Sequence, residues 1–552
     1  MEKESLSRRG FLKGSVIAAA GAVSAATLPG RSASESSAVS PDWKPETWDY
    51  ETDVLVIGYG GAGMWSALTA KDECGADVLV LEKAPFRGGG NSAYNFGEFQ
   101  IPTSEEGGIT YIQAASRGLT SESMARAWVK EAMRNPEYAD KYDYPWYQEE
   151  DRRSASGTNC EYPFLPGGDT MGVAKCEGLG MAAFDILDAH RKRLGIEVLF
   201  DCHDEELIQD PLTKEILGCW TLIGSDSTPK SIKARKGTVM CTGGFEFNEE
   251  MKNNFLKCTP QKFYGWKYNT GDGITMVGKV GAQLWHMDLA IGGAWMYPAN
   301  HDPDFPWNIP MASVKDRAYI HVNQLGNRWH NELERSNPHN GWHAYLPFNE
   351  LIADFDHIPN WVIFDQTGFD AGPIGPRSTD MMAHANYCEG FPKELGGWDD
   401  WSLDNVDELN KGWIFKSDTL EGLATQIKEQ TMWMSAENLV ATVAEFNGYC
   451  RDGEDLKFNR AADRMSPLEN PPYYAIAIYP GGCSTLGGPK KNENAQVLDW
   501  ADQPIPRLYS AGSFGNFIGH TYGITGGNVA ENMVFGRLAA RHASALAPWD
   551  EA

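Results

Sequence analysis

Residues 52–63 read TDVLVIGYGGAG, and this segment determines the class of fold. The run at 52–57 is typical of a buried parallel strand, and a G-x-G-x-x-G turn follows it at once. The sequence then predicts a helix over 64–74 and a second strand over 77–81 that ends at Glu82. A lone glycine motif is weak evidence. Here a strand, the glycines, a helix, a second strand and an acid follow one another within about thirty residues. This order indicates a dinucleotide-binding βαβ unit.

Each residue type in this unit has a mechanical reason. Gly58 permits a tight turn, Gly60 lets the backbone approach a pyrophosphate, and Gly63 lets the helix pack on the strand. The helix N-terminus offers free N–H groups to the phosphate charge, and Glu82 can accept hydrogen bonds from ribose hydroxyls. We therefore expect the dinucleotide to be bound by Gly58, Gly60, Gly61, Ala62, Gly63 and Glu82.

A second glycine-rich segment favours FAD over NAD as the dinucleotide. EKAP at 82–85 leads to GGGNSA at 88–93, whose backbone can approach the pyrophosphate or the flavin. A plain surface turn is the alternative interpretation of these glycines. This pair of loops resembles the FAD-binding domain of the fumarate reductase and 3-ketosteroid dehydrogenase superfamily.

Further segments resemble the same superfamily. A predicted strand at 236–240 leads into CTGGF at 241–245, NTGDGI occupies 269–274, PRLYSAG occupies 506–512, and GGNVA at 526–530 opens the last helix. A helix N-terminus aimed at the flavin can stabilise the anion of the reduced ring. Beside the first glycine turn and its acid, the resemblance assigns cofactor contacts to Lys83, Asn91, Ser92, Gly97, Gly243, Asp272, Gly512, Ser513, Asn528 and Val529.

The resemblance implies an α/β fold, in which a Rossmann-like FAD-binding domain carries an inserted α+β capping domain. The active site would lie between the two, over the flavin ring. Trp, Tyr, His and Pro are frequent in the cap segment, which suits an aromatic-lined cavity or an ordinary aromatic core. The expected organisation is a signal peptide at 1–31, a linker at 32–50, the FAD-binding domain at 51–290 and 472–546, and the cap at 291–471.

The N-terminal segment resembles a twin-arginine export signal. SRRGFLK at 7–13 precedes an apolar stretch at 15–28, which is too short to span a bilayer of about 30 Å comfortably. An amphipathic or anchoring N-terminal helix is the alternative. Because the twin-arginine route is understood to carry folded proteins, often with a bound cofactor, the resemblance implies an FAD-loaded protein exported across the cytoplasmic membrane to the periplasm or cell envelope.

Composition excludes other classes of protein. The 552-residue chain has a net charge of −27, which repels nucleic-acid phosphates, so no nucleic-acid partner is expected. Removal of residues 1–31, which hold five basic and two acidic side chains, would leave −30. The ten cysteines show no C-x-x-C pair, so we predict mostly reduced thiols and no metal site. Convergence of distant cysteines on a metal is left open by the sequence.

The positions at which fumarate reductases hold a dicarboxylate differ in this chain. A carboxylate buried over the flavin needs Arg or His to offset its desolvation. Ile524 stands at the place of the clamping Arg, and Cys483 and Ser484 stand at the place of a His-Thr pair. WMYP at 295–298 is the nearest counterpart of a His-Pro-Thr segment. These departures disfavour a small dicarboxylate substrate.

Two residues are candidates for catalysis. GHTYG at 519–523 is more similar to the ketosteroid dehydrogenase branch, in which this segment supplies a tyrosine. The phenol of Tyr522 can donate to a ketone oxygen and stabilise an enolate, and simple packing beside the flavin is the alternative. IHVNQLGNRWHNE at 320–332 resembles the cap turn that precedes the family's proton donor. That donor follows four residues after the Glu, where this chain has Ser336.

Arg335, one residue before that position, is our candidate acid. Its guanidinium has a very high pKa, so an ion pair with Glu332 or Glu334 is the alternative role. Three other residues are rival candidates for the acid, namely His339, His343 and Tyr345. A surface or packing role is the alternative for each of them.

The sequence thus predicts an exported FAD-dependent oxidoreductase acting on CH–CH groups. We expect it to reduce an activated C=C bond in a ketone-bearing or other non-dicarboxylate organic substrate, by hydride transfer from flavin N5 and protonation by a cap residue. A 3-ketosteroid-type dehydrogenase running in the desaturating direction and a non-catalytic flavin electron carrier are the alternatives. No c-type haem motif is visible, so we expect a separate electron donor, such as a membrane-anchored cytochrome or a quinol system.

Overall fold

The chain divides into two units, Met1–Trp43 and Lys44–Ala552. The predicted twin-arginine signal lies outside the described residues, and so do Arg335 and Ser336. The computed structural model describes residues 43–95, 97–148, 160–292, 294–296, 309–310, 314, 317–333, 339–375 and 401–551.

In the described part of the chain the first sheet has eight strands, and its centre confirms the predicted βαβ unit. β1 (Tyr50–Ile57) runs parallel to β2 (Val78–Leu81) on one side and to β9 (Lys230–Met240) on the other. β22 (Pro504–Ser510) lies parallel to β9, so a strand from far along the chain returns to the sheet. The order is β21-β22-β9-β1-β2-β6, with a β7–β8 hairpin paired to β9. The other strands are β6 (Glu197–Leu199), β7 (Cys202–Gln209), β8 (Ile216–Ile223) and β21 (Gln496–Leu498).

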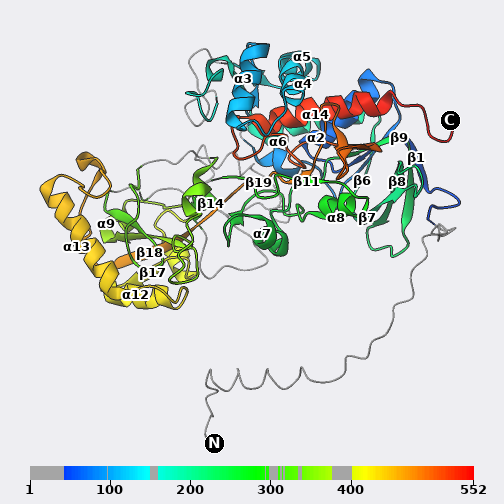
Figure 1. Ribbon diagram of the computed structural model, residues 1–552. Helices are drawn as coiled ribbons and strands as arrows, with labels where there is room; N and C mark the ends of the chain where they lie inside the picture. Colours follow the sequence, from blue (N-terminus) through cyan, green and yellow to red (C-terminus); the bar gives the residue numbers. More distant parts are fainter. Residues whose placement is uncertain are drawn as a thin grey trace, which may run out of the picture. The chain divides into compact units, whose positions relative to one another are not determined.

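Two helices pack side by side on this sheet. α2 (Gly61–Leu68) begins in the glycine turn and continues as the π-helical turn η1 (Thr69–Glu73), which confirms the predicted helix. α14 (Gly527–Ser544) runs alongside α2 (Figure 1). Gly536 permits this close approach, because a Cβ at that position would lie 3.0 Å from the carbonyl oxygen of Ala62.

Alternating side chains of β1 face two separate cores. Val54 and Val56 join a buried cluster with residues of α2 and α14, whereas Leu55 and Ile57 join a second cluster with residues of α8 (Asp272–Lys279). Successive side chains of a strand point to opposite faces of its sheet. The first sheet is therefore covered on both faces, as the near-continuous apolar run of β1 requires.

The second sheet is built around β18 (Tyr473–Gly482) and has seven strands among the residues that the structure describes. β13 (Ala294–Met296), β16 (Asn360–Asp365) and β17 (Phe415–Ser417) all pair antiparallel with β18. β10 (Lys262–Phe263) pairs parallel with it. The predicted cap ends before β18, yet this strand completes the sheet of the cap, because backbone pairing joins strands that are distant in sequence.

Helices and aromatic side chains cover the second sheet. α12 (Leu420–Lys428) and α13 (Ala436–Asp452) share a buried cluster with one set of strand residues. Phe364 and Tyr474 belong to another cluster, in which their rings stack with centroids 5.4 Å apart. The second sheet and its helices are thus an α+β part of the unit Lys44–Ala552, and the predicted α/β class of fold is confirmed.

Several helices begin at the residue types that favour helix N-termini. A side chain before the helix accepts a hydrogen bond from the first turn in five of them, at Ser104, Ser121, Asn248, Thr419 and Ser435.

Among the described residues, no helix combines the length and the apolar character needed to cross a membrane. The remaining helices are α3 (Glu105–Ala115), α4 (Glu122–Ala132), α5 (Asn135–Lys141), α6 (Leu179–Arg193), α7 (Glu249–Phe255), α9 (Gln366–Asp370) and α11 (Val406–Asn410). The remaining strands are β3 (Phe99–Gln100), β4 (Trp146–Tyr147), β5 (Val173–Cys176), β11 (Leu284–Trp285), β12 (Ala290–Ile291), β14 (Ile309–Pro310), β15 (Tyr319–Val322), β19 (Ser484–Thr485) and β20 (Gly488–Pro489).

Candidate active site

A cavity of about 580 Å³ lies at the carboxyl ends of the central strands of the first sheet. Its lining includes the last residues of β1 and β2, Ile57 and Leu81. It also includes Cys241 and Ala511, the first residues after β9 and β22. Ligands of open parallel sheets bind outside the carboxyl ends of the strands, so this is the place where the fold presents a site.

The cavity collects most of the predicted cofactor residues, and only Gly63 and Gly97 of that set do not line it. Gly63 lies where α2 packs on β1, and a Cβ there would collide with the carbonyl oxygen of Gly58. Gly97 has a φ of +69° and packs against Cys176. The predicted residues in the lining are Gly58, Gly60, Gly61, Ala62, Glu82, Lys83, Asn91, Ser92, Gly243, Asp272, Gly512, Ser513, Asn528 and Val529.

The glycine turn before α2 is shaped to receive an anion. Gly58 has a φ of +100°, and a Cβ there would collide with the carbonyl oxygen of Cys241. The N–H of Gly61 donates to Ser92 Oγ at 3.1 Å. Gly60, the N-cap residue of α2, has no side chain to cap the helix, and the first turn contains no acidic residue. The positive end of the helix is therefore available to a phosphate group, which fits the pyrophosphate of a dinucleotide.

Glu82 and Lys83 follow β2 at the cavity wall. The two carboxylate oxygens of Glu82 accept hydrogen bonds from the backbone N–H groups of Tyr59 and Ala84, both at 2.8 Å. Burial raises the pKa of Glu82 to about 7. Lys83 Nζ pairs with an oxygen of Asp272 at 2.6 Å. This group of side chains lies where the sequence analysis expects the ribose.

Some lining residues were missed by the sequence analysis. Glu205 on β7 lines the cavity, and burial, reinforced by the charge of Asp272, raises its pKa to about 7. Three aromatic side chains also line it, at Tyr264, Trp266 and Tyr268. No local motif marks these residues, because they reach the cavity only through the path of the folded chain.

Asn91 ties the second glycine loop to the segment that begins at Cys483. Its Nδ2 donates to the carbonyl oxygen of Cys483 at 2.6 Å and to Ser484 Oγ at 3.0 Å, while its Oδ1 accepts from the N–H of Trp266 at 2.8 Å. Cys483 and Ser484 line the cavity, whereas Ile524 is buried in the first core and does not. Two of the three substituted clamp positions therefore border the site.

Tyr522 is buried in the cavity wall beside the N-terminus of α14. Its phenolic oxygen accepts a hydrogen bond from the N–H of Asn528 at 3.2 Å, and burial raises its pKa far above the ordinary value. Asn340 holds the Tyr522 backbone, because Nδ2 donates to its carbonyl oxygen at 2.8 Å and Oδ1 accepts from its N–H at 3.0 Å. The phenol is thus neutral and fixed in place.

His339 and Glu161 form an ion pair in the same wall. His339 Nδ1 lies 2.8 Å from Glu161 Oε1, and Thr525 Oγ1 donates to that oxygen at 2.7 Å. The rings of His339 and Tyr522 meet edge to face, with centroids 5.2 Å apart. Burial opposes the charged imidazole, but the charge and hydrogen bond of Glu161 outweigh it and raise the pKa of His339.

The other candidate acids are placed differently. Arg335 and Ser336 lie outside the described residues. His343 and Tyr345 pack against tryptophan rings, and neither lines the cavity. Of the three rival acids, His339 is therefore the one that reaches the site.

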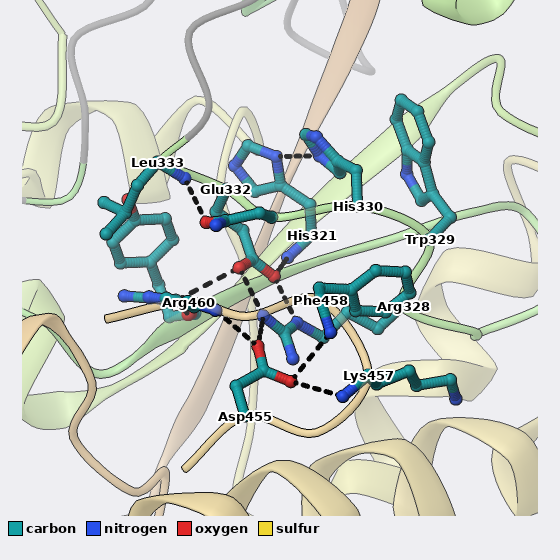
Figure 2. A network of polar contacts seen from close by, with 12 residues as sticks. His321, Arg328, Trp329, His330, Glu332, Leu333, Asp455, Lys457, Phe458 and Arg460 are labelled. Atoms are coloured by element: carbon teal, nitrogen blue, oxygen red, sulfur yellow. Dashed lines mark hydrogen bonds and ion pairs between the residues drawn. The ribbon is translucent and has the colours of Figure 1, made fainter. Parts of the chain in front are cut away.

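A buried ionic network holds the cap turn that precedes His339 in the chain (Figure 2). Arg328 Nε and Nη2 donate to the two carboxylate oxygens of Glu332 at 2.6 and 2.8 Å. Arg328 Nη2 also donates to Asp455 at 2.7 Å, and Arg460 pairs with Glu332 at 3.3 Å. These four side chains are at most 1% exposed. The Arg and Glu of the cap motif therefore serve to fix the turn.

The cavity lining is acidic. Its cations are Lys83 and His339, both paired with carboxylates, and the described lining contains no arginine. Within the described part of the chain, no group of three or more His, Cys, Asp or Glu could hold a metal ion. The lining carboxylates are Glu82, Glu98, Glu161, Glu205 and Asp272.

Comparisons with known proteins agree with this geometry. The family described as FAD binding domain matches residues 53–529. The chain is 27% identical to 3-oxosteroid 1-dehydrogenase of Mycolicibacterium smegmatis, over 90% of this chain and 98% of the relative. It is also 27% identical to digoxin reductase of Eggerthella lenta, over 99% of this chain and 98% of the relative.

Solved structures show the same fold. The crystal structure of 3-ketosteroid delta1-dehydrogenase from Sterolibacterium denitrificans matches with a TM-score of 0.69 and 24% identity, over 90% of this chain and 99% of that one. A flavocytochrome c3 fumarate reductase in an open conformation matches with a TM-score of 0.63 and 23% identity, over 90% and 78% of the two chains.

The fold and the site together define an FAD-dependent oxidoreductase. The chain belongs to the FAD binding domain family. Its relatives at 26–27% identity include a 3-oxosteroid 1-dehydrogenase and a probable fumarate reductase.

Proposed function

We propose that the protein is a reductase that saturates an activated carbon–carbon double bond in a ketone-bearing or other non-dicarboxylate organic molecule. The observation that carries this proposal is the buried phenol of Tyr522 in the cavity wall. Its oxygen accepts a hydrogen bond from Asn528, and its proton is the group that it can donate to a ligand. A ketone oxygen is an acceptor that suits such a donor.

Hydride addition to an enone moves negative charge onto the ketone oxygen as an enolate. FAD, when bound, supplies the hydride from its N5 atom. Tyr522 stabilises the enolate by donating its phenolic proton as a hydrogen bond. The N–H of Asn528, at the positive end of α14, offsets the charge that this donation builds on the phenol oxygen. A proton from a second side chain then completes the reduction.

The residues that would hold FAD divide between two helix N-termini. The glycine turn at Gly58, Gly60 and Gly61 would take the pyrophosphate, and Glu82 would accept from the ribose hydroxyls. Asn528 and Val529, at the start of α14, would face the flavin end. With this division, Tyr522 would lie at the flavin end of the cavity, since its phenol accepts from Asn528.

The charges in the cavity support a substrate without carboxylate groups. A buried carboxylate needs a cation to offset its desolvation. The described lining has no arginine, and Lys83 is paired with Asp272. Cys483 and Ser484 offer a thiol and a hydroxyl. A ketone needs only a hydrogen-bond donor, which Tyr522 provides.

The relatives include enzymes named for both directions of reaction. Digoxin reductase is named for addition of hydrogen and aligns with 99% of this chain, which favours the reductive direction. A desaturating dehydrogenase of the 3-ketosteroid type is the second candidate, because GHTYG at 519–523 is similar to that branch. A non-catalytic electron carrier is the third, although a carrier has no need of a phenol and an ion pair in the cavity wall.

We also propose that the protein is exported by the twin-arginine route to the periplasm or cell envelope. The support for this location is the sequence SRRGFLK at 7–13 and the apolar stretch after it. An exported reductase needs electrons at that location, so its donor would be a separate membrane-anchored cytochrome or quinol system.

Anaerobic stopped-flow experiments on the flavin-loaded protein test the proposed reaction. In a reductase, an enone reoxidises the reduced flavin and is converted to the saturated ketone. Flavin absorbance and product analysis record these two changes. A dehydrogenase shows the opposite behaviour, since its oxidised flavin is bleached by the saturated ketone. A carrier reacts with neither compound, and this result would contradict the proposal.

A further inference from the structure

The ion pair of His339 with Glu161 borders the same space as Tyr522. His339 Nδ1 lies 2.8 Å from Glu161 Oε1, and the His339 ring is 5.2 Å from the Tyr522 ring between centroids. Thr525 holds the carboxylate by donating to Oε1 at 2.7 Å. An imidazole oriented by a carboxylate beside a hydrogen-bond donor is an arrangement suited to proton transfer.

The titratable groups around His339 favour its charged form. Burial disfavours the imidazolium, but Glu161 outweighs burial and raises the pKa of His339, with a smaller contribution from Glu98. Lys175 pairs with Glu98 at 3.1 Å and moderates that contribution. Tyr522 stays neutral, because burial raises its pKa far above the ordinary value. Among the described groups, Glu161 therefore contributes most to the charged form of His339.

We propose that His339 is the acid that protonates the substrate carbon, a role that rests on the proposed reductase function. Hydride adds to one carbon of the double bond, and the π electron pair moves to the ketone oxygen as an enolate held by Tyr522. The enolate pair then forms a bond between the neighbouring carbon and the proton of His339 Nε2, and that N–H bond breaks. The imidazole is left neutral with Nδ1 bonded to Glu161, and solvent returns one proton.

Other side chains near the cavity are poorer acids. His343 and Tyr345 do not line it. Cys483 lines the cavity, but burial raises the pKa of its thiol to about 11. The thiol is therefore a weak proton donor near neutral pH. Tyr522 already donates to the ketone oxygen in the proposed reaction. His339 is thus a donor separate from Tyr522, because the ketone oxygen needs a hydrogen bond and the neighbouring carbon needs a proton.

Substitution of His339 separates this role from binding. In the flavin-loaded protein, His339→Gln should slow reoxidation of reduced flavin by an enone at least about 100-fold. Reoxidation by ferricyanide, which needs no carbon protonation, should keep its wild-type rate. His343→Gln is the matched control on the same segment, and it should leave both rates unchanged. Binding of the enone to the oxidised protein, followed by flavin absorbance, should stay within a few-fold of wild type in both variants.

The pH dependence gives a readout that a merely structural role would not change. His339 must carry its proton, so the wild-type rate should fall as the pH rises through the pKa of His339. Because Glu161 raises that pKa above the ordinary value of 6.5, this fall should lie above pH 6.5. Glu161→Gln should move the fall to lower pH, and His339→Gln should abolish it.

Histidine NMR of the flavin-loaded protein, labelled with ¹³C-histidine, tests the charge without turnover. The His339 signal, assigned by its loss in His339→Gln, should report an imidazolium at pH 6.5, and a neutral ring at that pH would overturn the inference. A wild-type rate and pH profile in His339→Gln would also overturn it, while leaving the reductase function intact. If wild-type protein reduced no enone, the proposed function itself would fail.

Discussion

Single side chains set the chemistry of the cavity, and their protonation depends on their surroundings. Tyr522 is buried and accepts from Asn528, so its phenol stays neutral and is aimed by a helix N-terminus. Burial also raises the pKa of the Glu246 carboxyl to about 7. This carboxyl accepts a hydrogen bond from the N–H of Thr485 at 2.8 Å. The first group bears on the rate of reaction and the second on stability.

Tyr522→Phe should lower the rate of enone-dependent flavin reoxidation by about 100- to 1000-fold, because one donor to the developing oxyanion is lost. The FAD content of the purified protein should stay at the wild-type level. Tyr345→Phe removes a hydroxyl from a buried tyrosine outside the cavity lining, so it should leave the rate unchanged. An unchanged rate in Tyr522→Phe would assign Tyr522 to packing alone.

Glu246→Gln should flatten the pH dependence of stability. The pKa of Glu246 is raised from 4.5 to about 7 in the folded state, so the folded protein keeps a proton that the unfolded chain releases between these values. Wild-type stability from this residue is therefore full below pH 4.5 and falls as the pH rises towards 7. Glutamine cannot ionise, so the variant avoids this loss of unfolding free energy, which amounts to roughly 3 kcal/mol.

Denaturant unfolding of wild type and Glu246→Gln at pH 5 and pH 8 measures this difference. The variant should gain stability relative to wild type at the higher pH and little at the lower one. Glu250→Gln, on the exposed side of α7, is the control and should show no such trend. A gain of equal size at both pH values would rule out the ionisation argument.

At the scale of elements, local motifs made the central strands of the first sheet predictable. β1, the glycine turn and α2 follow one another within a few residues, so their types and spacing predicted both the strand and the helix. β18 was placed in the FAD-binding domain, but it pairs with β13, β16 and β17 of the cap. Its own sequence carries no information about partners so distant along the chain, which is why the second sheet was not predictable.

Gly63→Ala should destabilise the junction of α2 and β1, because the added Cβ collides with the backbone of Gly58. We expect a loss of about 1–3 kcal/mol, together with weaker FAD retention. Gly278→Ala, in α8, is the matched control, since a Cβ there has no atom within 4 Å. It should stabilise the protein by about 0.5–1 kcal/mol. Thermal unfolding and FAD content report both effects, and equal behaviour of the two variants would contradict the packing argument.

Glu332→Ala should break the buried network of the cap (Figure 2), since it leaves the guanidinium of Arg460 without its carboxylate and Arg328 with Asp455 alone. The expected cost is about 3–5 kcal/mol. Glu445→Ala removes an exposed partner of Lys457 and should cost less than about 1 kcal/mol. Denaturant unfolding compares the two variants, and equal costs would show that burial does not set the strength of the network.

For the whole molecule, the site depends on contacts that span most of the chain. Glu161 and His339 are 178 residues apart, and no spacing rule joins them. His339 was predicted as a rival acid from the sequence, whereas Glu161 was not predicted, because it lies in no motif. By contrast, most predicted cofactor residues line the cavity, since they belong to short glycine-rich segments or directly follow a strand.

Export is also a property of the whole molecule. Replacement of Arg8 and Arg9 by Lys should stop translocation, because the paired arginines are the specific feature of the proposed signal. Cell fractionation should then find FAD-loaded, full-length protein on the cytoplasmic side. Unchanged export of the Arg8→Lys, Arg9→Lys variant would contradict the twin-arginine route.

The central claim is reduction of a double bond activated by a ketone rather than by carboxylates. It is tested most directly by mixing the anaerobically reduced, flavin-loaded protein with a cyclic enone or with fumarate and following flavin absorbance. We predict rapid reoxidation by the enone, with formation of the saturated ketone, and no acceleration by fumarate. Rapid reoxidation by fumarate, or none by any enone, would contradict the account.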